Sequence, residues 1–352
     1  MVYPTPHKAL GAALSCTVCR ARRVLRMECP RGVATRGVAT WRGSEMKIAI
    51  MGAGAVGGYY GGVLARFGED VTLICRGAHL DAIARDGLKL STHSGEFTVR
   101  PGATADPSEV GRADLILYTV KTYSNPTVLP LIEPMVGTQT VILTVQNGVS
   151  SGATIAQRYG WDRVLPGATY IEAGLTAPGR IEQAGPTALI EFGERSGEIT
   201  SRVDEIALVL SKEGIQVETS KDIEASLWSK MVSVAAIGTI MTVARASLAE
   251  ILSGPWGELT LRSVMDEVFA VGRAAGVAIP AGIVDDKMRT AIAEAEEYKS
   301  SLQLDLEMGR PLEIDDIIGA VVSHGQTHGV PTPASAALYT ALSKFKTGRP
   351  DS

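Results

Sequence analysis

The chain has 352 residues, a formal net charge of −4, 45% hydrophobic residues and 20% charged residues. These values are ordinary for a globular protein, and the length suggests two domains. The acidic balance disfavours a nucleic-acid partner, and no apolar run of about 18–20 residues predicts a membrane span. Cys75 is the only cysteine after residue 45, which suits a reducing compartment, so we expect a soluble, cytoplasmic protein.

Residues 1–45 differ from the rest of the chain, and we interpret them as a non-globular extension. They hold seven arginines and one lysine against two glutamates. One hypothesis is a mis-assigned start, with Met46 as the true first residue; the other is an arginine-rich targeting segment. The extension also holds three of the four cysteines. A structural zinc site needs a fourth well-placed ligand, which is missing here, so no metal is expected.

The first motif that indicates chemistry lies at the start of the remaining chain. Residues 47–51, KIAIM, predict a buried parallel strand, which leads into a GxGxxG segment and then a helical pattern. In that context the glycines permit a tight turn, a close approach to a pyrophosphate, and close packing of the helix on the strand. The helix N-terminus faces the anion. We therefore predict a dinucleotide-binding loop made of Gly52, Ala53, Gly54, Ala55, Val56 and Gly57.

The end of the second predicted strand, 70–76, bears on the choice of dinucleotide. An NAD site places an acidic residue there to bind the ribose hydroxyls, whereas an arginine suits the 2′-phosphate of NADP. The chain has Arg76 at this point and no acid until Asp81. Arg76 could also end the strand in solvent without a ligand. Its position favours NADPH as the cofactor.

Two more buried strands are predicted within 113–123 and 140–149, and Lys121 and Asn147 follow them. Ligands of open α/β sheets bind at the carboxyl ends of the strands, so both side chains are expected at the rim of the dinucleotide site.

Between about 164 and 218 the pattern changes to short or alternating strands with glycine and proline turns, around a helix near 198–213. We expect these strands to extend the sheet, with 177–185, APGRIEQAG, as an exposed connection.

The second half of the chain is predicted to be all helical. Helical periodicity runs through 223–244, 255–276, 281–296, 312–329 and 332–345. The predicted fold class is therefore α/β, with a Rossmann-type NADP-binding domain over 46–220, an all-α domain over 221–346, and a short tail over 347–352.

Three polar residues of the helical half are candidates for a site. Lys230 lies in SLWSKMVSVAAIG, with apolar, small or hydroxyl-bearing neighbours at helical spacing. Its stem could run along the surface to solvent, or its ammonium could face a cleft. Ser301 could be a surface hydroxyl, and Glu313 could serve the dipole at the start of the predicted helix 312–329. The turn 308–313 could bring Ser301 and Glu313 to one rim.

Together these motifs resemble those of the ketopantoate reductase (2-dehydropantoate 2-reductase) family. The resemblance covers about 46–346 and is carried by MGAGAVGGYYGG, ICRGAHL, VKTY, QNGV, PGRIEQAG, EFGE, LWSKMV, SSLQLDLEMGRPLEID and HGVPTP. It implies a Rossmann-type domain followed by an all-α domain like that of 6-phosphogluconate dehydrogenase. It also implies an NADPH-dependent oxidoreductase of pantothenate biosynthesis that acts on a small 2-oxo acid, and it is compatible with a homodimer.

The resemblance also implies roles for individual residues. Gly52, Gly54 and Gly57 match the pyrophosphate loop, Arg76 matches the contact to the 2′-phosphate, and Lys121 and Asn147 match residues that bind cofactor and substrate near the nicotinamide. Lys230 matches the catalytic lysine that protonates the ketone oxygen. Ser301 matches the serine that holds the substrate carboxylate, and Glu313 matches the acid near the lysine and the cofactor, counted here as catalytic.

The chain departs from the family pattern where asparagines are expected to line the substrate pocket. Val234 and Gly238 stand one and two turns after Lys230, and Tyr298 stands three residues before Ser301. Losing these amides is expected to weaken binding of a hydroxylated substrate roughly tenfold or more. Two substrates therefore stay open: 2-dehydropantoate, reduced to (R)-pantoate, and a different, less hydroxylated oxo acid.

Two other functions remain as alternatives from the sequence. A non-catalytic NADP-binding regulator would bind the cofactor without turnover, and the presence of both Lys230 and Glu313 disfavours it. An opine-type dehydrogenase would need a suitably placed His/Asp pair, whereas His324 and His328 are expected on the surface, late on a helix.

Overall fold

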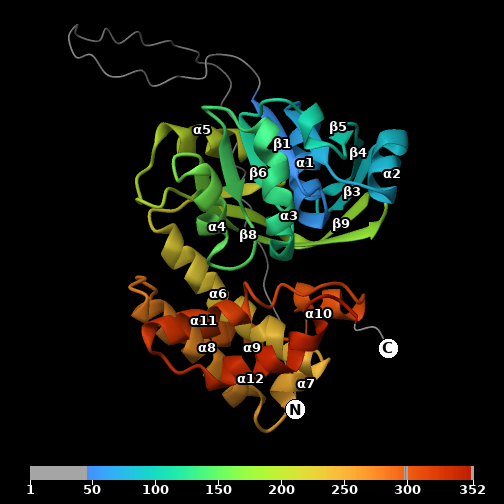
Figure 1. Ribbon diagram of the computed structural model, residues 1–352. Helices are drawn as coiled ribbons and strands as arrows, with labels where there is room; N and C mark the ends of the chain where they lie inside the picture. Colours follow the sequence, from blue (N-terminus) through green and yellow to red (C-terminus); the bar gives the residue numbers. More distant parts are fainter. Residues whose placement is uncertain (1–45, 297, 299, 350–352) are drawn as a thin grey trace, which may run out of the picture. The chain divides into compact units, whose positions relative to one another are not determined.

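The computed structural model describes residues 46–296, 298 and 300–349. The predictions made for residues 1–45, and for the end of the tail at 350–352, lie outside the described residues. Within them, strands and helices are interspersed up to residue 219, and from residue 223 onward the regular structure is helical (Figure 1). This agrees with the predicted α/β class followed by an all-helical half.

Ten strands of the described chain form one mixed sheet in the order β4-β3-β9-β8-β7-β6-β1-β2-β5, with β10 paired to β9. The strands are β1 (Lys47–Met51), β2 (Asp70–Ile74), β3 (Leu88–Thr92), β4 (Gly95–Val99), β5 (Gly102–Thr104), β6 (Leu115–Tyr118), β7 (Val141–Thr144), β8 (Val164–Ala177), β9 (Arg180–Phe192) and β10 (Gln216–Thr219).

The parallel part of the sheet carries the predicted dinucleotide motif. β1 pairs in parallel with β2 and β6, and β6 pairs in parallel with β7. Every residue of β6 and β7 is buried. Continuous apolar strands of this kind are expected where both faces of a parallel sheet are covered. The two faces of β1, β6 and β7 indeed belong to two separate hydrophobic clusters.

The helices that accompany the sheet connect its strands. They are α1 (Ala55–Arg66), α2 (Ala78–Asp86), α3 (Asn125–Val128), α4 (Ser151–Tyr159), α5 (Ser201–Leu210) and the short 3-10 helices η1 (Pro107–Glu109), η2 (Thr122–Ser124) and η3 (Leu129–Met135). α1 follows the glycine segment as predicted, and α5 confirms the helix expected near 198–213.

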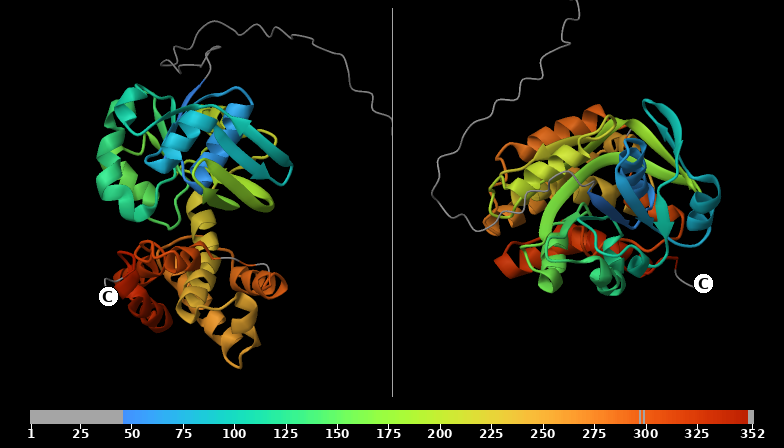
Figure 2. Two further views of the ribbon diagram at one scale, coloured as in Figure 1. Left: turned by 90° about the vertical axis from the view of Figure 1, so that its right-hand side faces the viewer. Right: turned by 90° about the horizontal axis from the view of Figure 1, so that it is seen from above.

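β8 is the strand that joins the two halves of the sheet. Its first residues pair in parallel with β7, and from Gly167 onward it pairs antiparallel with β9. The two strands run together as a long, curved ribbon (Figure 2). The expectation that 177–185 is a connection is wrong for most of that segment, although more than half of its residues are exposed as expected. Only a two-residue turn separates β8 from β9, and Ile181 and Gln183 are buried in β9 because they face the core and Tyr59.

The segment between Gly77 and Thr104 was not anticipated from the sequence. It forms α2 and the strands β3, β4 and β5; β3 pairs antiparallel with β4 and in parallel with β9. These strands are short and largely polar, so their place in the sheet depends on tertiary pairing more than on local periodicity.

The second half folds into α6 (Ile223–Ala244), α7 (Leu248–Ser253), α8 (Gly257–Ala274), α9 (Ile283–Ala293), α10 (Ser301–Glu307), α11 (Ile318–His328), α12 (Pro333–Leu342) and η4 (Ser343–Phe345). All five predicted helical segments contain one of these helices. α6 has the predicted bounds because the Asp222 side chain accepts a hydrogen bond from the Ala225 amide at its N-terminus.

The predicted helix 312–329 begins six residues late, at Ile318, so Glu313 is not in a first helical turn. Residues 314–317 form a turn closed by a hydrogen bond from the Gly319 amide to the Ile314 carbonyl. The Glu313 carboxylate is engaged by another part of the chain, described below, and a helix dipole plays no part in its position.

Among the described helices, α6 is long and apolar enough to cross a membrane, with a mean hydropathy of 1.5. However, 67% of that stretch is buried inside the protein. Its buried residues, including Trp228, Val232 and Ile240, belong to the hydrophobic cluster of the helical half. The apolar character of α6 is therefore accounted for by its packing as a core helix.

Candidate active site

The glycine segment has the geometry that the motif predicts. Gly52 has a φ of +96°, and a Cβ there would lie 2.6 Å from the Val120 side chain. At Gly57 a Cβ would lie 2.3 Å from Thr119 Oγ1 and 2.6 Å from the Gly52 carbonyl. By contrast, a Cβ on Gly54 would meet no atom within 4 Å. The protein itself therefore requires glycine at 52 and 57, while the space at 54 is open for a ligand.

The start of α1 offers donors for an anion. Gly54 is the N-cap residue, and Ala55, Val56 and Gly57 form the first turn. The N–H groups of a first helical turn have no partner within the helix and lie at the positive end of its dipole. The loop residue Ala53 is buried, and its carbonyl accepts a hydrogen bond from His79 of α2. The loop can therefore receive a phosphate group at a fixed position.

Arg76 lies two residues beyond β2, the strand next to β1, and its side chain is exposed. Gly77 follows it with a φ of +62°, and α2 begins at Ala78. Arg76 thus follows the carboxyl end of β2, where the Gly52 and Ala53 amides donate to the Ile74 carbonyl, and its side chain is exposed to a ligand. The other interpretation from the sequence, in which Arg76 ends the strand in solvent without a ligand, agrees equally well with an exposed side chain.

Lys121 connects the strand-rich half to the helical half. It follows β6, and its Nζ lies 2.9 Å from Asp305 Oδ2 on α10 and 2.9 Å from Glu313 Oε2. The second oxygen of Glu313 accepts a hydrogen bond of 2.8 Å from the Thr122 amide. Both carboxylates are buried. Burial alone would lower the pKa of Lys121, but the charges of Glu313 and Asp305 outweigh it and raise the pKa above its usual value.

Lys230 points from α6 toward the strand ends, and it is not a solvent-exposed lysine. Its Nζ donates hydrogen bonds to Asn147 Oδ1 at 3.0 Å and to the Thr169 carbonyl at 2.8 Å. It also lies 5.3 Å from the centre of the Tyr170 ring. Asn147 follows β7, the neighbour of β6, so the structure brings together the carboxyl ends of both strands as predicted.

The surroundings of Lys230 make its ammonium a usable acid. Burial lowers the pKa of Lys230 to about 8, the Glu313 charge opposes this, and Lys287 of α9 adds to the lowering. A lysine with an ordinary pKa near 10.4 would hold its proton more firmly at neutral pH. Glu313 influences Lys230 through space, while its hydrogen bonds go to Lys121 and Thr122.

A small pocket lies beside the ammonium, lined by Gln146, Asn147, Gly148, Leu227, Lys230, Met231 and Val234. The Gln146 amide donates to the Val120 carbonyl and to Asn125 Oδ1, both at 2.8 Å. Its donors are therefore occupied within the protein. The helix face in this pocket, Leu227, Met231 and Val234, supplies only apolar atoms.

The remaining predicted substrate residues lie on α6 and near α10. Gly238 is buried, and a Cβ there would meet only Ser300 Oγ, at 3.3 Å. Ser300 is the buried N-cap of α10 and donates to the Gly238 carbonyl. Ser301 is the first residue of α10 and is exposed. Tyr298 is half-buried, and burial raises its pKa to about 12.

Three residues of this site were missed by sequence reasoning. Asp305 stands four residues after Ser301, between Leu304 and Leu306, and an acid between two leucines was an available signal. Thr169 and Tyr170 carried no such signal, because they reach Lys230 only through the pairing of β8. The expectation that His324 is on the surface is wrong: it is half-buried, with its ring 5.5 Å from that of Trp228. His328 is exposed as expected.

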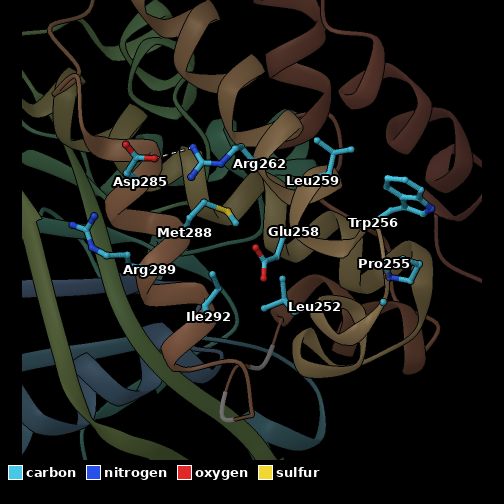
Figure 3. Close-up of a pocket in the computed structure, with 11 residues that line it drawn as sticks. Leu252, Pro255, Trp256, Glu258, Leu259, Arg262, Asp285, Met288, Arg289 and Ile292 are labelled. Atoms are coloured by element: carbon cyan, nitrogen blue, oxygen red, sulfur yellow. Dashed lines mark ion pairs between the residues drawn. The ribbon is translucent and has the colours of Figure 1, made fainter.

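A larger cavity of the described chain lies elsewhere. It has a volume of about 690 Å³ and opens between α7, α8 and α9, with Trp256, Leu259 and the Arg262–Asp285 ion pair along its wall (Figure 3). None of the predicted site residues lines it. The predicted site therefore stands out by its arrangement of charged groups and not by the size of its cavity.

The chain was then compared with known proteins. Residues 48–197 match the family model described as "Ketopantoate reductase PanE/ApbA", and residues 222–346 match its C-terminal counterpart, "Ketopantoate reductase PanE/ApbA C terminal". A 2-dehydropantoate 2-reductase from Mesorhizobium japonicum is 32% identical over 325 residues, covering 86% of this chain and 99% of that protein.

Solved structures give the same result. A PanE/ApbA family ketopantoate reductase from Ralstonia eutropha superposes with a TM-score of 0.80 at 33% identity, covering 86% of this chain and 98% of the other. A 2-dehydropantoate 2-reductase from Geobacter metallireducens has a TM-score of 0.80 at 34% identity, covering 85% and 99%. From both halves of the sequence and from its fold, the chain belongs to the ketopantoate reductase family of oxidoreductases, which act on CH–OH and C=O groups.

Proposed function

We propose that this protein catalyses the NADPH-dependent reduction of a 2-oxo acid to a 2-hydroxy acid, with 2-dehydropantoate as the first candidate substrate and (R)-pantoate as its product. The observation that carries the proposal is the half-buried ammonium of Lys230 at the carboxyl ends of two parallel strands, 3.0 Å from Asn147. The names of the relatives support 2-dehydropantoate and, with it, a role in pantothenate biosynthesis.

The residues of the glycine loop fit NADPH. The open space at Gly54 and the first-turn N–H groups of α1 suit a pyrophosphate, and the exposed Arg76 suits a 2′-phosphate. When bound, NADPH supplies the hydride for the reduction. The absence of an acid between Arg76 and Asp81 supports NADPH over NADH.

Lys230 is proposed as the general acid. An ammonium has three donors, and two are directed at Asn147 and the Thr169 carbonyl, which leaves one for the ketone oxygen of a substrate. Donating that proton as the carbonyl carbon is reduced neutralises the developing alkoxide, and the positive charge stabilises the oxygen before transfer is complete. A pKa of about 8 keeps the group protonated at neutral pH while making it a better acid than an exposed lysine.

The neighbouring residues position the reactants. Asn147 fixes the Lys230 ammonium and faces the same pocket as the substrate. Glu313 holds Lys121 at the end of β6 and adds negative potential that helps keep Lys230 protonated. Ser301, exposed at the start of α10, is proposed to bind the substrate carboxylate. The small 2-oxo acid is the only partner that the proposal requires, with neither nucleic acid nor membrane involved.

The cellular setting belongs to the same proposal. The reaction needs NADPH and a soluble acid, and Cys75, the one cysteine in the described part of the chain, is a free thiol. Both suit a cytoplasmic enzyme.

A second candidate substrate, a less hydroxylated 2-oxo acid, is favoured by the wall of the pocket. Leu227, Met231 and Val234 offer no hydrogen bond, and the Gln146 amide is occupied. A site that leaves a substrate hydroxyl without a partner loses affinity for it, by roughly tenfold or more. Such a pocket would instead accept an aliphatic side chain next to the 2-oxo group.

The decisive experiment measures NADPH oxidation by the wild-type chain and by Lys230→Ala over a panel of 2-oxo acids that includes 2-dehydropantoate and apolar analogues. We expect the substitution to reduce kcat by about three orders of magnitude, while the dissociation constant for NADPH stays within about twofold, since general-acid catalysis contributes roughly 10²–10⁴-fold. Full activity of the variant would contradict the proposed role of Lys230.

The same panel separates the candidate functions. A preference for 2-dehydropantoate supports the first substrate, and a preference for the apolar analogues supports the second. Val234→Asn should then move the preference toward 2-dehydropantoate, because it adds an amide to the apolar wall. NADPH binding without turnover of any oxo acid would identify a regulator and overturn the proposal.

A further inference from the structure

We propose that Tyr170 is a positioning residue for the reduction, and that its aromatic face holds the Lys230 ammonium in its protonated, substrate-directed state. The inference rests on the proposed role of Lys230 and assigns a task to a strand residue that makes no covalent or proton-transfer step itself.

The Tyr170 ring lies close to the Lys230 ammonium. Lys230 Nζ lies 5.3 Å from the centroid of Tyr170, within the distance at which a cation is attracted by the face of an aromatic ring. The adjacent residue of β8, Thr169, accepts a hydrogen bond from the same ammonium at 2.8 Å. Two consecutive strand residues therefore contact one cation, one through its backbone and one through its ring.

Hydrogen bonds through Glu191 connect the Tyr170 ring to α6, the helix that carries Lys230. The Tyr170 hydroxyl donates to Glu191 Oε2 of β9 at 3.5 Å, a long hydrogen bond. The other carboxylate oxygen of Glu191 accepts a hydrogen bond from Ser226. Ser226 stands one turn before Lys230 on α6 and so shares its face. The Tyr170 ring is therefore linked to α6 twice, through Glu191 and Ser226 and through its contact with Lys230. These contacts fix the ring relative to the ammonium.

The phenol of Tyr170 also stays neutral. Burial and the nearby Glu191 both raise the pKa of Tyr170, so the phenol stays neutral throughout the range in which Lys230 titrates. A phenol that donates to a carboxylate also has a more electron-rich ring, which strengthens its attraction for a cation. The carboxylate thus assists the ring without contacting the ammonium.

Two other charged groups near Lys230 also influence its pKa. Glu313 favours the ammonium, and Lys287 of α9 disfavours it. Neither group touches the Tyr170 ring in the contacts described above, so a change at Tyr170 leaves both in place. Removing the ring therefore lowers the pKa of Lys230, because the ammonium loses an attraction that the neutral amine does not share.

The test compares Tyr170→Leu with Tyr170→Phe in the full chain, using two measurements. The first is the pH dependence of kcat/KM for the best oxo acid of the panel. The second is the pH dependence of acetylation of Lys230 by acetic anhydride, followed by mass spectrometry of the labelled peptide. Only the free amine reacts, so this reports the pKa of Lys230 without requiring turnover.

We expect Tyr170→Leu to move both titrations of Lys230 to lower pH by roughly half to one unit, and Tyr170→Phe to stay much closer to the wild type. Rescue by phenylalanine separates the ring from general damage to the strand. Unchanged or raised titrations in the leucine variant would overturn the inference, since water admitted by a smaller side chain raises the pKa of a buried lysine.

The outcomes also separate this inference from the proposed function. If the wild-type chain reduces no oxo acid but the labelling titration still moves in Tyr170→Leu, the proposed function fails and the contact of ring with ammonium stands. If turnover depends on Lys230 but both titrations ignore Tyr170, the function stands and the positioning role fails.

Discussion

At the scale of single residues, the two lysines of the site differ in their hydrogen-bond partners and in the direction of their pKa shifts. Lys121 is held by two buried carboxylates, which raise its pKa, whereas Lys230 is held by neutral acceptors and its pKa is lowered to about 8. The first therefore stays charged under all ordinary conditions, and the second can give up a proton. This division was not available from the sequence, where each lysine simply followed or interrupted an apolar run.

The first prediction at this scale concerns pH. Because the proposed general acid must be protonated and its pKa is about 8, kcat/KM should be level below pH 7 and fall about tenfold per pH unit well above 8. Glu313→Gln removes a charge that raises this pKa and should shift the decline to lower pH. Lys230→Arg should show low activity without the decline, since arginine does not deprotonate in this range. A level profile from pH 7 to 9.5 in the wild type would contradict the assignment.

The second residue-scale prediction concerns Arg76. Its exposed guanidinium is proposed to bind the 2′-phosphate, which NADH lacks. Arg76→Ala should raise KM for NADPH about tenfold, which corresponds to about 1.4 kcal/mol, in the range of hydrogen bonds to charged groups. KM for NADH should change less than twofold. Equal effects on both cofactors, measured by initial rates at saturating oxo acid, would show that Arg76 acts on the fold or on a shared part of the cofactor.

At the scale of elements, β8 brings into contact parts that the sequence keeps apart. It leaves β7 after three paired residues and continues along β9, which places Thr169 and Tyr170 against α6. The turn between β8 and β9 in turn supports the dinucleotide loop: the Gly179 amide donates to His79 Nδ1, and His79 contacts the Ala53 carbonyl. One strand pair therefore supports both the proposed catalytic lysine and the proposed cofactor site.

The glycines at the start of α1 allow a matched pair of variants. Gly57→Ala forces a Cβ to within 2.3 Å of Thr119 Oγ1 and 2.6 Å of the Gly52 carbonyl, so the packing of α1 on the sheet must shift. A cost of about 1–3 kcal/mol in the free energy of unfolding is expected for overpacking of this kind. Gly54→Ala meets nothing within 4 Å, so its stability should stay within about 0.5 kcal/mol of the wild type.

Of the two variants, Gly54→Ala is the one expected to weaken binding of the cofactor directly. Gly54→Ala places its methyl group where the pyrophosphate is proposed to bind, so NADPH affinity should fall at least tenfold in a protein of normal stability. Thermal unfolding and cofactor titration of both variants check this. If Gly54→Ala binds NADPH as tightly as the wild type, the pyrophosphate does not bind beside residue 54.

At the scale of the whole molecule, the sequence predicted the elements better than their meeting points. The glycine loop, the parallel strands and the helical half followed from local patterns, because buried strands and helices each have their own periodicity. The strands between Leu88 and Thr104 and the late start of α11 did not: the strands depend on tertiary pairing, and Glu313, which was expected in the first helical turn, is instead paired with Lys121. Residues that meet across the two halves, such as Asp305 with Lys121, have no spacing in the sequence to mark them.

The last prediction concerns that meeting point. Lys121 carries the positive charge between two carboxylates of the helical half, and both carboxylates are buried. Lys121→Met leaves these charges without their ammonium, although Arg310 still lies 3.3 Å from Asp305. Removing one partner of a fully buried ion pair costs about 3–5 kcal/mol. Because the Lys121 side chain is 37% exposed, we expect a smaller loss in the free energy of unfolding, about 1–3 kcal/mol.

Arg158→Met is the matched control, because Arg158 pairs with Glu133 at the same distance, 2.9 Å, with both side chains well exposed. Its effect should stay below about 1 kcal/mol. Equilibrium unfolding in urea, followed by tryptophan fluorescence, compares the two. In Lys121→Met combined with Glu313→Gln, the total loss should be smaller than the sum of the single losses, since the second change removes a charge that the first left unpaired. Equal losses for Lys121→Met and Arg158→Met would mean that the ion pairs of Lys121 contribute no more to joining the two halves than a surface pair does.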